Sequence, residues 1–180
     1  AQQGEFDGLK ECGAEVLMGK YWVKGKACFG CRWPACGHWA EIKEGPYKGL
    51  AFEGIQAGAI IALGSMVGIS DPEAILRLNA FCNRLGICFI SAGTIIAWSI
   101  EAYQKGDLTR SDTDGLELKW NDPETVYELI RRIAYREGPF ADLLAEGLAS
   151  AVQEIGRGGD YAMVIKGTEW SQMCANAYFV

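Results

Sequence analysis

The sequence has 180 residues, 49% of them hydrophobic, and a formal net charge of −6 at pH 7. A chain of this length can bury one core without disulfides, and its acidic balance leaves no surplus positive charge for phosphates. The longest apolar stretch, roughly residues 55–67, contains Gln56 and Ser65 and is too short to cross a bilayer. These features favour a globular protein that neither binds nucleic acid nor spans a membrane.

The seven cysteines are odd in number and clustered, which fits metal ligation in a reducing compartment better than a disulfide scaffold. The sequence starts at Ala1 without an initiator methionine, and no signal-peptide pattern follows. We therefore expect a cytoplasmic protein whose first residues come from the interior of a longer chain.

Residues 1–50 mix glycine, cysteine, aromatic and charged residues with little periodicity, which predicts a loop-rich region. The pattern becomes helical from about residue 54, and the apolar stretch at 55–67 indicates a buried core helix. We predict a mainly α fold, with the loop-rich cysteine region at 1–50 and a multi-helix domain at 51–180, both parts of one larger protein.

Asp-Pro pairs predict the starts of two helices. Asp71 is typical of an N-cap and Pro72 of a first helical position, and Gly86 ends this helix. The next helix, of about 12 residues, ends at Gly106, and a polar surface loop covers 107–118.

The second Asp-Pro start, at Asp122, precedes an apolar stripe at helical spacing. Gly138 and Pro139 are expected to close this helix. A further amphipathic helix is predicted from Phe140 to Ile155, followed by a glycine-rich turn and a short strand-like segment at 161–167.

Cys28, Cys31 and Cys36 place three thiols within nine residues, and Gly30 permits a tight turn between the first two. Thiolates are soft ligands that suit iron–sulfur clusters or zinc. The spacing therefore predicts a metal site, although it does not choose the metal.

A four-iron cluster needs a fourth ligand from elsewhere, such as Cys12, Cys82, Cys88, Cys174 or a segment outside this sequence. Zinc could be bound locally, because His38 lies two residues after Cys36 and would complete a Cys₃His site. We favour the interpretation of His38 as a surface or supporting residue over its being a metal ligand.

Several separated motifs occur in the order KACFGCRWPACG, GPYKGLAFEG, IALGSMVGISDPEAI and NAFCNRLGICFISAGTIIAWSIEAYQKG. They continue through LIRRIAYREGPFADLLAEGLASAVQEIG and YAMVIKGTE. Over roughly residues 5–169 the sequence resembles the middle and following domains of the aldehyde ferredoxin oxidoreductase family.

This resemblance implies a tungsten- or molybdenum-bis-pterin beside a 4Fe-4S cluster, and oxidation of a small aldehyde to a carboxylic acid. Electrons would pass to ferredoxin or to an iron–sulfur electron-transfer subunit. Cys28, Cys31 and Cys36 match the first three cluster ligands, although four residues separate the last two where three are usual. The first pterin-binding domain and the fourth cysteine belong to other parts of such an enzyme, so this chain alone is expected to be inactive.

By the same resemblance, Asn83, Gly86, Ile87 and Cys88 fall at the loop that contacts the pterin. Asn83 replaces an aspartate there, and Cys88 stands where an acidic residue is common. A helix stopped by glycine exposes backbone groups that could bond a pterin, but a plain Schellman cap explains the same residues without a ligand.

Glu53 occupies the region where the family carries a carboxylate near the metal, and it is the candidate catalytic residue. A glutamate there could take up the proton of a hydrated aldehyde. Glu41 and Glu44 are rivals, and a solvated loop carboxylate is the alternative for each of them.

Other functions fit the same residues. Within the family, a benzoyl-coenzyme A reductase-like subunit would reduce an aromatic ring at the same kind of site. An electron-transfer subunit would carry iron without tungsten or molybdenum, and a zinc-binding helical interaction module would use His38 as a ligand.

Overall fold

The computed structural model of the chain describes residues 6, 8, 10–27, 29–32 and 37–170. Helices make up most of its regular structure, which confirms the mainly α fold. In chain order the elements are α1 (Ala14–Tyr21), β1 (Trp22–Lys26), β2 (Gly37–Glu41), β3 (Ala51–Glu53), α2 (Ala57–Ile60), the π-helix η2 (Ile61–Ser65), α3 (Pro72–Leu85), α4 (Phe89–Lys105), α5 (Pro123–Tyr135), α6 (Pro139–Ala145), α7 (Leu148–Ile155), β4 (Val164–Ile165) and β5 (Thr168–Glu169).

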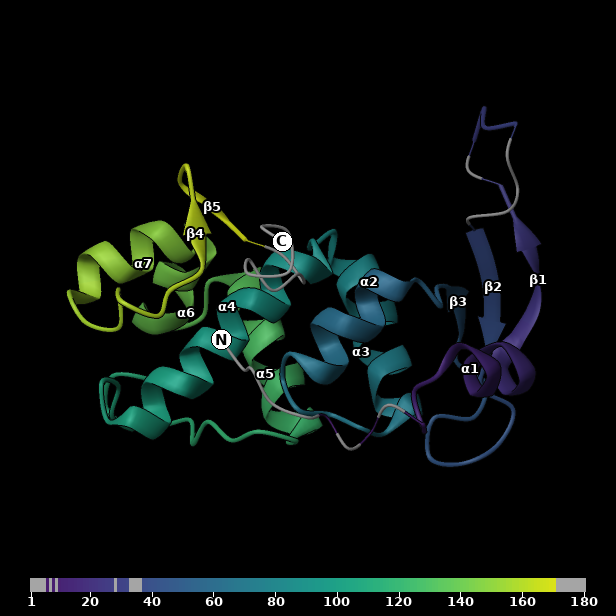
Figure 1. Ribbon diagram of the computed structural model, residues 1–180, viewed down its shortest axis with the longest axis horizontal. Helices are drawn as coiled ribbons and strands as arrows, with labels where there is room; N and C mark the ends of the chain where they lie inside the picture. The colour runs from purple at the N-terminus through teal and green to yellow at the C-terminus, as the bar shows by residue number, and fades with distance from the viewer. Residues whose placement is uncertain (1–5, 7, 9, 28, 33–36, 171–180) are drawn as a thin grey trace, which may run out of the picture.

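The chain runs from a sheet end through a helical body to a distal end (Figure 1). The sheet end consists of α1 and three antiparallel strands in the order β1-β2-β3. The helical body consists of α2, η2, α3, α4 and α5, and the distal end consists of α6, α7 and the β4–β5 hairpin.

Local signals fix the ends of α3, as expected. The Asp71 side chain accepts a hydrogen bond from the backbone N–H of Glu73, Pro72 occupies the first turn, and Gly86 ends the helix with φ +69°. The signals recur in α5, where the Asp122 side chain accepts from the backbone N–H of Thr125. Both Asp-Pro starts are therefore confirmed.

The structure corrects the expected extent of several elements. Within residues 1–50, α1, β1 and β2 were not predicted, although more than half of the described residues there lie in loops and turns. The helix expected from Phe140 to Ile155 is two helices, because Gly147 adopts φ +93° at the N-cap of α7. Helix α5 ends at Tyr135, and Pro139 starts α6 instead of closing α5.

The other helices of the body match their predictions more closely. The apolar stretch at 55–67 is helical and largely buried, but it is split into α2 and the π-helix η2. Helix α4 ends at Gly106 as expected, although it is longer than predicted, with 17 residues. Residues 107–118 form turns, and the strand-like segment contributes to the β4–β5 hairpin.

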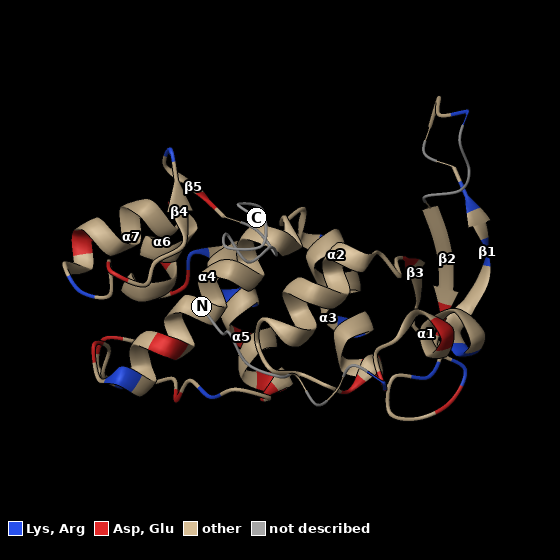
Figure 2. Ribbon diagram, viewed as in Figure 1, with Lys and Arg blue, Asp and Glu red and all other residues tan. Residues whose placement is uncertain are grey.

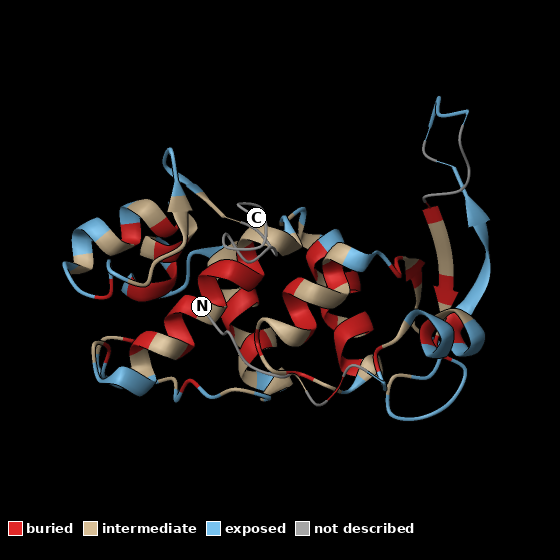
Figure 3. Ribbon diagram, viewed as in Figure 1, coloured by how far each residue is buried: buried red, intermediate tan, exposed pale blue. Residues whose placement is uncertain are grey.

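The larger hydrophobic core lies in the helical body and extends into the distal end (Figure 3). A smaller core lies under the sheet and joins α1, β2 and β3 to α3. Leu76 and Ala80 of α3 belong to the smaller core, whereas Leu78 and Cys82 belong to the larger one. Helix α3 therefore packs against both cores and sets the position of the sheet relative to the other helices.

Acidic and basic side chains are interspersed over the surface of the molecule (Figure 2). Among the described residues no single helix is long and apolar enough to cross a bilayer. Helices α3 and α4 pass such a test only when taken together, and they are bent by 117° at the break between them.

Candidate cofactor site

The three candidate cluster cysteines belong to the loop of the β1–β2 hairpin. Lys26 at the end of β1 pairs with Gly37 at the start of β2, so the two ends of the loop are held side by side. Residue 37 must be glycine in this arrangement, because a Cβ there would lie 1.9 Å from the carbonyl oxygen of Lys26. The hairpin thus constrains both ends of the segment that carries the cysteines.

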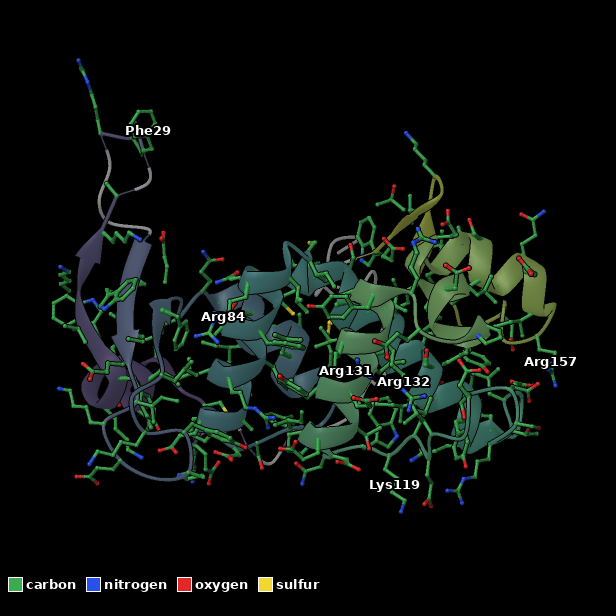
Figure 4. The ribbon with its side chains drawn as sticks, turned by 180° about the vertical axis from the view of Figure 1, so that it is seen from behind. Phe29, Arg84, Lys119, Arg131, Arg132 and Arg157 are labelled. Carbon is green, nitrogen blue, oxygen red and sulfur yellow. The ribbon has the colours of Figure 1, made fainter. Side chains whose placement is uncertain are left out.

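The described part of this loop projects into solvent. Phe29 is fully exposed and lies near the tip of this loop, which rises away from the helical body (Figure 4). Cys31 is exposed, whereas Cys28 and Cys36 lie outside the described residues. Among the described residues no three His, Cys, Asp or Glu side chains form a group that could hold a metal. A cluster at the loop therefore remains a prediction from the cysteine spacing and the resemblance.

Glu53, the candidate catalytic carboxylate, lies at the base of this loop. Its Oε2 is 2.9 Å from Nζ of Lys26. Its Oε1 lies 3.5 Å from the position that a Cβ at residue 37 would occupy. Because Glu53 pairs with Trp39 across β2 and β3, its side chain shares a sheet face with Trp39 and Lys26. The Lys26 ammonium also lies 5.0 Å from the centre of the Trp39 ring.

The rival carboxylates are nearer to the cysteine loop in the sequence, but they lie at the opposite end of the sheet from it. Glu41 is at the other end of β2, where it pairs with Ala51, and Glu44 is exposed beyond it. His38 lies in β2 next to the loop, and its Nδ1 is buried without a hydrogen-bond partner among the described residues. Of the three carboxylates, Glu53 is therefore the one beside the loop.

The turn between α3 and α4 contains the four candidate pterin-binding residues. The backbone N–H of Ile87 donates to the carbonyl of Cys82, and that of Gly86 donates to the carbonyl of Asn83. These two bonds define a Schellman motif. Asn83, Gly86 and Cys88 are exposed, so the turn presents its polar groups to solvent.

Two helix ends of opposite polarity meet at this turn. Helix α3 ends at Gly86, and α4 begins after Cys88, whose side chain makes no capping hydrogen bond. The last carbonyls of a helix and the first N–H groups of the next need partners from outside the helices. The turn therefore offers both acceptors and donors, as the edge of a polar heterocycle requires.

Asn83 also connects the turn to the sheet end, since its Nδ2 donates to the backbone carbonyl of Glu53 at 2.9 Å. The backbone of Glu53, the candidate catalytic residue, is thus bonded to the candidate pterin turn. Figure 4 shows Arg84, the next residue, on the side of the helical body that faces the sheet.

The two cysteines near this turn differ in environment. Cys82 is fully buried at the end of α3, and burial, together with the nearby Cys88, raises the pKa of its thiol to about 12. Cys88 is exposed. Cys82 is therefore a protonated core residue, and Cys88 is the accessible thiol of the pair.

An open groove of about 520 Å³ begins at this turn and continues towards the distal end. Its size suits a small organic ligand. The floor is mostly apolar, and charged groups lie at the rim. The lining residues are Ile87, Cys88, Ser91, Ala92, Ile95, Ile133, Ala134, Arg136, Leu144, Ala145, Glu146, Gly147, Gly167, Thr168 and Glu169.

Hydrogen bonds fix the charged rim of this groove. Glu169 of the β4–β5 hairpin accepts from the backbone N–H of Leu148 through Oε1, at 2.8 Å, which caps the N-terminus of α7. The Nη1 atom of Arg136 lies 2.7 Å from Oδ1 of Asp142, and its Nη2 atom lies 2.7 Å from Oε1 of Glu146. The charged groups of the groove are thus already paired, and its other lining residues are apolar apart from Cys88, Ser91 and Thr168.

The family model for domains 2 and 3 of aldehyde ferredoxin oxidoreductase matches residues 1–178. The chain belongs to this family. The tungsten-containing aldehyde ferredoxin oxidoreductase of Pyrococcus furiosus is 32% identical over 169 residues, which cover 93% of this chain and 27% of that protein. The corresponding protein of Thermococcus kodakarensis is 31% identical, with the same coverage.

Two other similar proteins have different names. The WOR-like subunit of an aliphatic sulfonate oxidoreductase from Pyrococcus furiosus is 34% identical over 172 residues, covering 92% of this chain and 27% of that protein. A chain of the active-site complex BamBC of benzoyl-coenzyme A reductase, solved with 1,5-dienoyl-coenzyme A, superposes with a TM-score of 0.69. It is 26% identical, and the match covers 88% of this chain and 23% of that one. The present chain thus spans about a quarter of the length of these relatives.

Sequence reasoning missed three residues that shape the candidate site. Lys26 and Glu169 act through partners far along the chain, so no local pattern indicated them. Asn79 lies one helical turn before Asn83 and is buried, as its place on the inner face of α3 could have suggested.

Proposed function

We propose that this chain forms part of a tungsten- or molybdenum-pterin, iron–sulfur oxidoreductase that oxidises aldehydes to carboxylic acids and passes electrons to ferredoxin. The observation that carries the proposal is the match to the family over nearly the whole chain. The names of the tungsten-containing relatives support the metal and the reaction.

The α3–α4 turn fits a pterin by the chemistry of its exposed groups. The side-chain amide of Asn83, the backbone at Gly86 and the uncapped start of α4 after Cys88 together supply donors and acceptors. The apolar groove that starts at Ile87 would hold the hydrocarbon part of a small substrate. When bound, the metal–pterin group supplies a two-electron redox centre, and the cluster carries electrons singly to the acceptor.

Glu53 would receive the proton that the hydrated aldehyde releases. Lys26 engages Oε2 and so holds in place the carboxylate that would take up this proton. Lys26 and the Asn83 bond to the Glu53 carbonyl hold the residue from two sides. Cys28, Cys31 and Cys36 would hold the cluster next to this carboxylate.

The first experiment measures iron, tungsten, molybdenum and zinc in the protein isolated anaerobically with its natural partner chains. Aldehyde-dependent reduction of a viologen dye then tests the activity. We expect iron with a group-six metal, and a loss of kcat of about 10²–10⁴-fold in Glu53→Gln. The matched variant Glu44→Gln, at an exposed rival carboxylate, should retain activity. Zinc alone, or equal loss in both variants, would refute the proposal.

A second candidate is reduction of an aromatic thioester at the same site. The structural match to the benzoyl-coenzyme A reductase chain and the apolar floor of the groove favour it. Consumption of benzoyl-coenzyme A with a reduced dye, without aldehyde oxidation, would select this reaction. Iron without tungsten or molybdenum would instead indicate an electron-transfer subunit.

A further inference from the structure

The groove that starts at the α3–α4 turn lies between two parts of the fold. Helices α4 and α5 line one side of it, and α6 with the β4–β5 hairpin lines the other (Figure 1). Ile87 and Cys88 line the groove and are also two of the candidate pterin-binding residues. A molecule in the groove would therefore lie beside the group that this turn is proposed to hold.

The side formed by α4 and α5 is apolar. It consists of Ala92 and Ile95 of α4 and Ile133 and Ala134 of α5, with Ile87 at its start. Ile95 belongs to the larger core, and Ile87 and Ile133 pack against that core, so this wall is anchored in the helical body. The small side chains of Ala92 and Ala134 leave space beside the isoleucines. An aromatic ring or a branched alkyl chain suits a groove of about 520 Å³ with such a wall.

The charged groups at the groove carry a net negative charge. Arg136 is the one cation among the described lining residues, and it pairs with both Asp142 and Glu146. Glu169 of β5 adds another carboxylate, whose Oε1 accepts from the backbone N–H of Leu148 at 2.8 Å. The start of α7 favours the ionised form of a carboxylate in this position. One cation is thus outnumbered by three carboxylates in and beside the groove.

This balance of charge disfavours an anionic ligand. Like charges brought together at a binding site weaken binding and select against the wrong ligand. Lys166, in the turn of the β4–β5 hairpin, is next to the lining residue Gly167 but does not itself line the groove. An uncharged ligand avoids the repulsion and can bury its apolar part against α4 and α5.

We propose that the groove selects an uncharged aldehyde with an aromatic or branched alkyl group, and that it rejects aldehydes carrying a carboxylate or a phosphate. Ala134 is a specificity-determining residue, because a larger side chain at this position of the apolar wall would fill the space for the ligand. The reaction rests on the proposed function, whereas the preference of the groove for uncharged ligands can be measured without it.

The first test measures binding to the full chain by nuclear magnetic resonance of the isoleucine methyl groups. Benzyl alcohol and benzyl phosphate are the probes, since they share a ring and differ in charge. We expect benzyl alcohol to shift the methyl signals of Ile95 and Ile133, and benzyl phosphate to bind at least about tenfold more weakly. Equal binding of the two probes, or no binding of benzyl alcohol, would overturn the proposal.

Variants at two alanines locate the bound probe. Ala134→Phe should abolish the shifts that benzyl alcohol causes, and Ala134→Leu repeats the test with a smaller side chain if phenylalanine disturbs folding. Ala149→Phe is the matched control, because Ala149 is a half-buried residue of α7 that does not line the groove. It should retain the shifts. Shifts that persist in both Ala134 variants would overturn the assignment of the site.

The second test uses the holoenzyme with its partner chains and compares kcat/KM between substrates. We expect 4-carboxybenzaldehyde to be oxidised at least about tenfold less efficiently than its uncharged methyl ester. Ala134→Phe should lower the ratio of kcat/KM for benzaldehyde to that for acetaldehyde by about tenfold, mainly through the KM for benzaldehyde. Ala149→Phe should leave this ratio unchanged.

The outcomes separate the selectivity of the groove from the proposed reaction. Equal efficiency with 4-carboxybenzaldehyde and its ester, or an unchanged ratio in Ala134→Phe, would overturn the selectivity while aldehyde oxidation stands. A holoenzyme that oxidises none of these aldehydes, although the chain binds benzyl alcohol as expected, would refute the proposed reaction and support the preference of the groove.

Discussion

The helical body and the sheet end of this chain are stabilised in different ways. The body starts its helices with aspartate caps and packs them around the larger core. The sheet end packs on the smaller core, and all five residues of its edge strand β1 are exposed. Exposed large apolar side chains gather there too, including Val16, Trp22, Val23 and Phe29. We infer that the helical body supplies most of the stability, whereas the sheet end presents the cysteine loop.

Thiol reactivity should separate the two regions most strongly. In the metal-free chain at pH 8, we expect Cys31 of the hairpin loop to react with iodoacetamide on the order of a thousand times faster than Cys82. Cys31 is exposed, whereas burial raises the pKa of Cys82 to about 12 and leaves little thiolate. Peptide mass spectrometry over time measures both rates. Similar rates would mean that the end of α3 opens readily.

Core truncations should show whether the sheet end can loosen alone. Leu78→Ala, in the larger core, is expected to cost about 2–5 kcal/mol of unfolding free energy, measured by urea denaturation. Ile42→Ala, in the smaller core, should chiefly speed amide exchange in β2 and β3 while the helical amides stay protected. Equal loss of protection throughout the chain would show that the two regions unfold as one unit.

Removing an aspartate cap should have a smaller effect. The Asp122 side chain accepts hydrogen bonds from both the backbone N–H and the hydroxyl of Thr125, at 3.1 Å and 2.7 Å. Asp122→Ala should therefore lower the unfolding free energy by about 1 kcal/mol. Asp160→Ala, at an exposed turn residue, serves as the control and should change little. Equal effects of the two substitutions would contradict the role of the cap.

The smallest expected effect concerns pH. Hydrogen bonds from Arg131, and then from Arg132, lower the pKa of Glu128 from 4.5 to about 2. The stabilisation of the folded state by these hydrogen bonds to Glu128 is thus fully present above about pH 4.5. It is lost as the pH falls towards 2. Because the ion pairs are partly exposed, Glu128→Gln should cost less than about 1 kcal/mol at pH 7. Denaturation at pH 7 and pH 3 should show the difference between variant and parent shrinking in acid.

The elements that sequence analysis predicted well are those fixed by neighbouring residues. Asp71, Asp122, Gly86 and Gly106 act on their own helix ends, so their effects are visible locally. The break at Gly147 was missed because the apolar spacing continues across it. The strand β1 was missed because it has no buried face to produce an alternating pattern, and β2 was missed with it as its hairpin partner.

The candidate site, too, has features that the sequence predicted and contacts that only the structure shows. The cysteine spacing and the helix end at Gly86 can be recognised in the sequence. In the structure they lie in a hairpin loop and in a Schellman turn, respectively. The bond from Asn83 to Glu53 and the ion pair of Glu53 with Lys26 join residues about 30 positions apart. Such partners depend on the folded chain and could not be inferred from local patterns.

We propose that the hairpin loop holds an iron–sulfur cluster in a pterin-dependent oxidoreductase. The most direct measurement is the iron and acid-labile sulfide content, with the visible spectrum, of the anaerobic protein and of Cys31→Ser. Cys88→Ser, at the exposed cysteine of the α3–α4 turn, is the control. We predict brown protein with iron and sulfide in the parent and in Cys88→Ser, and loss of both in Cys31→Ser. Undiminished iron in Cys31→Ser, or a parent that contains only zinc, would contradict the claim.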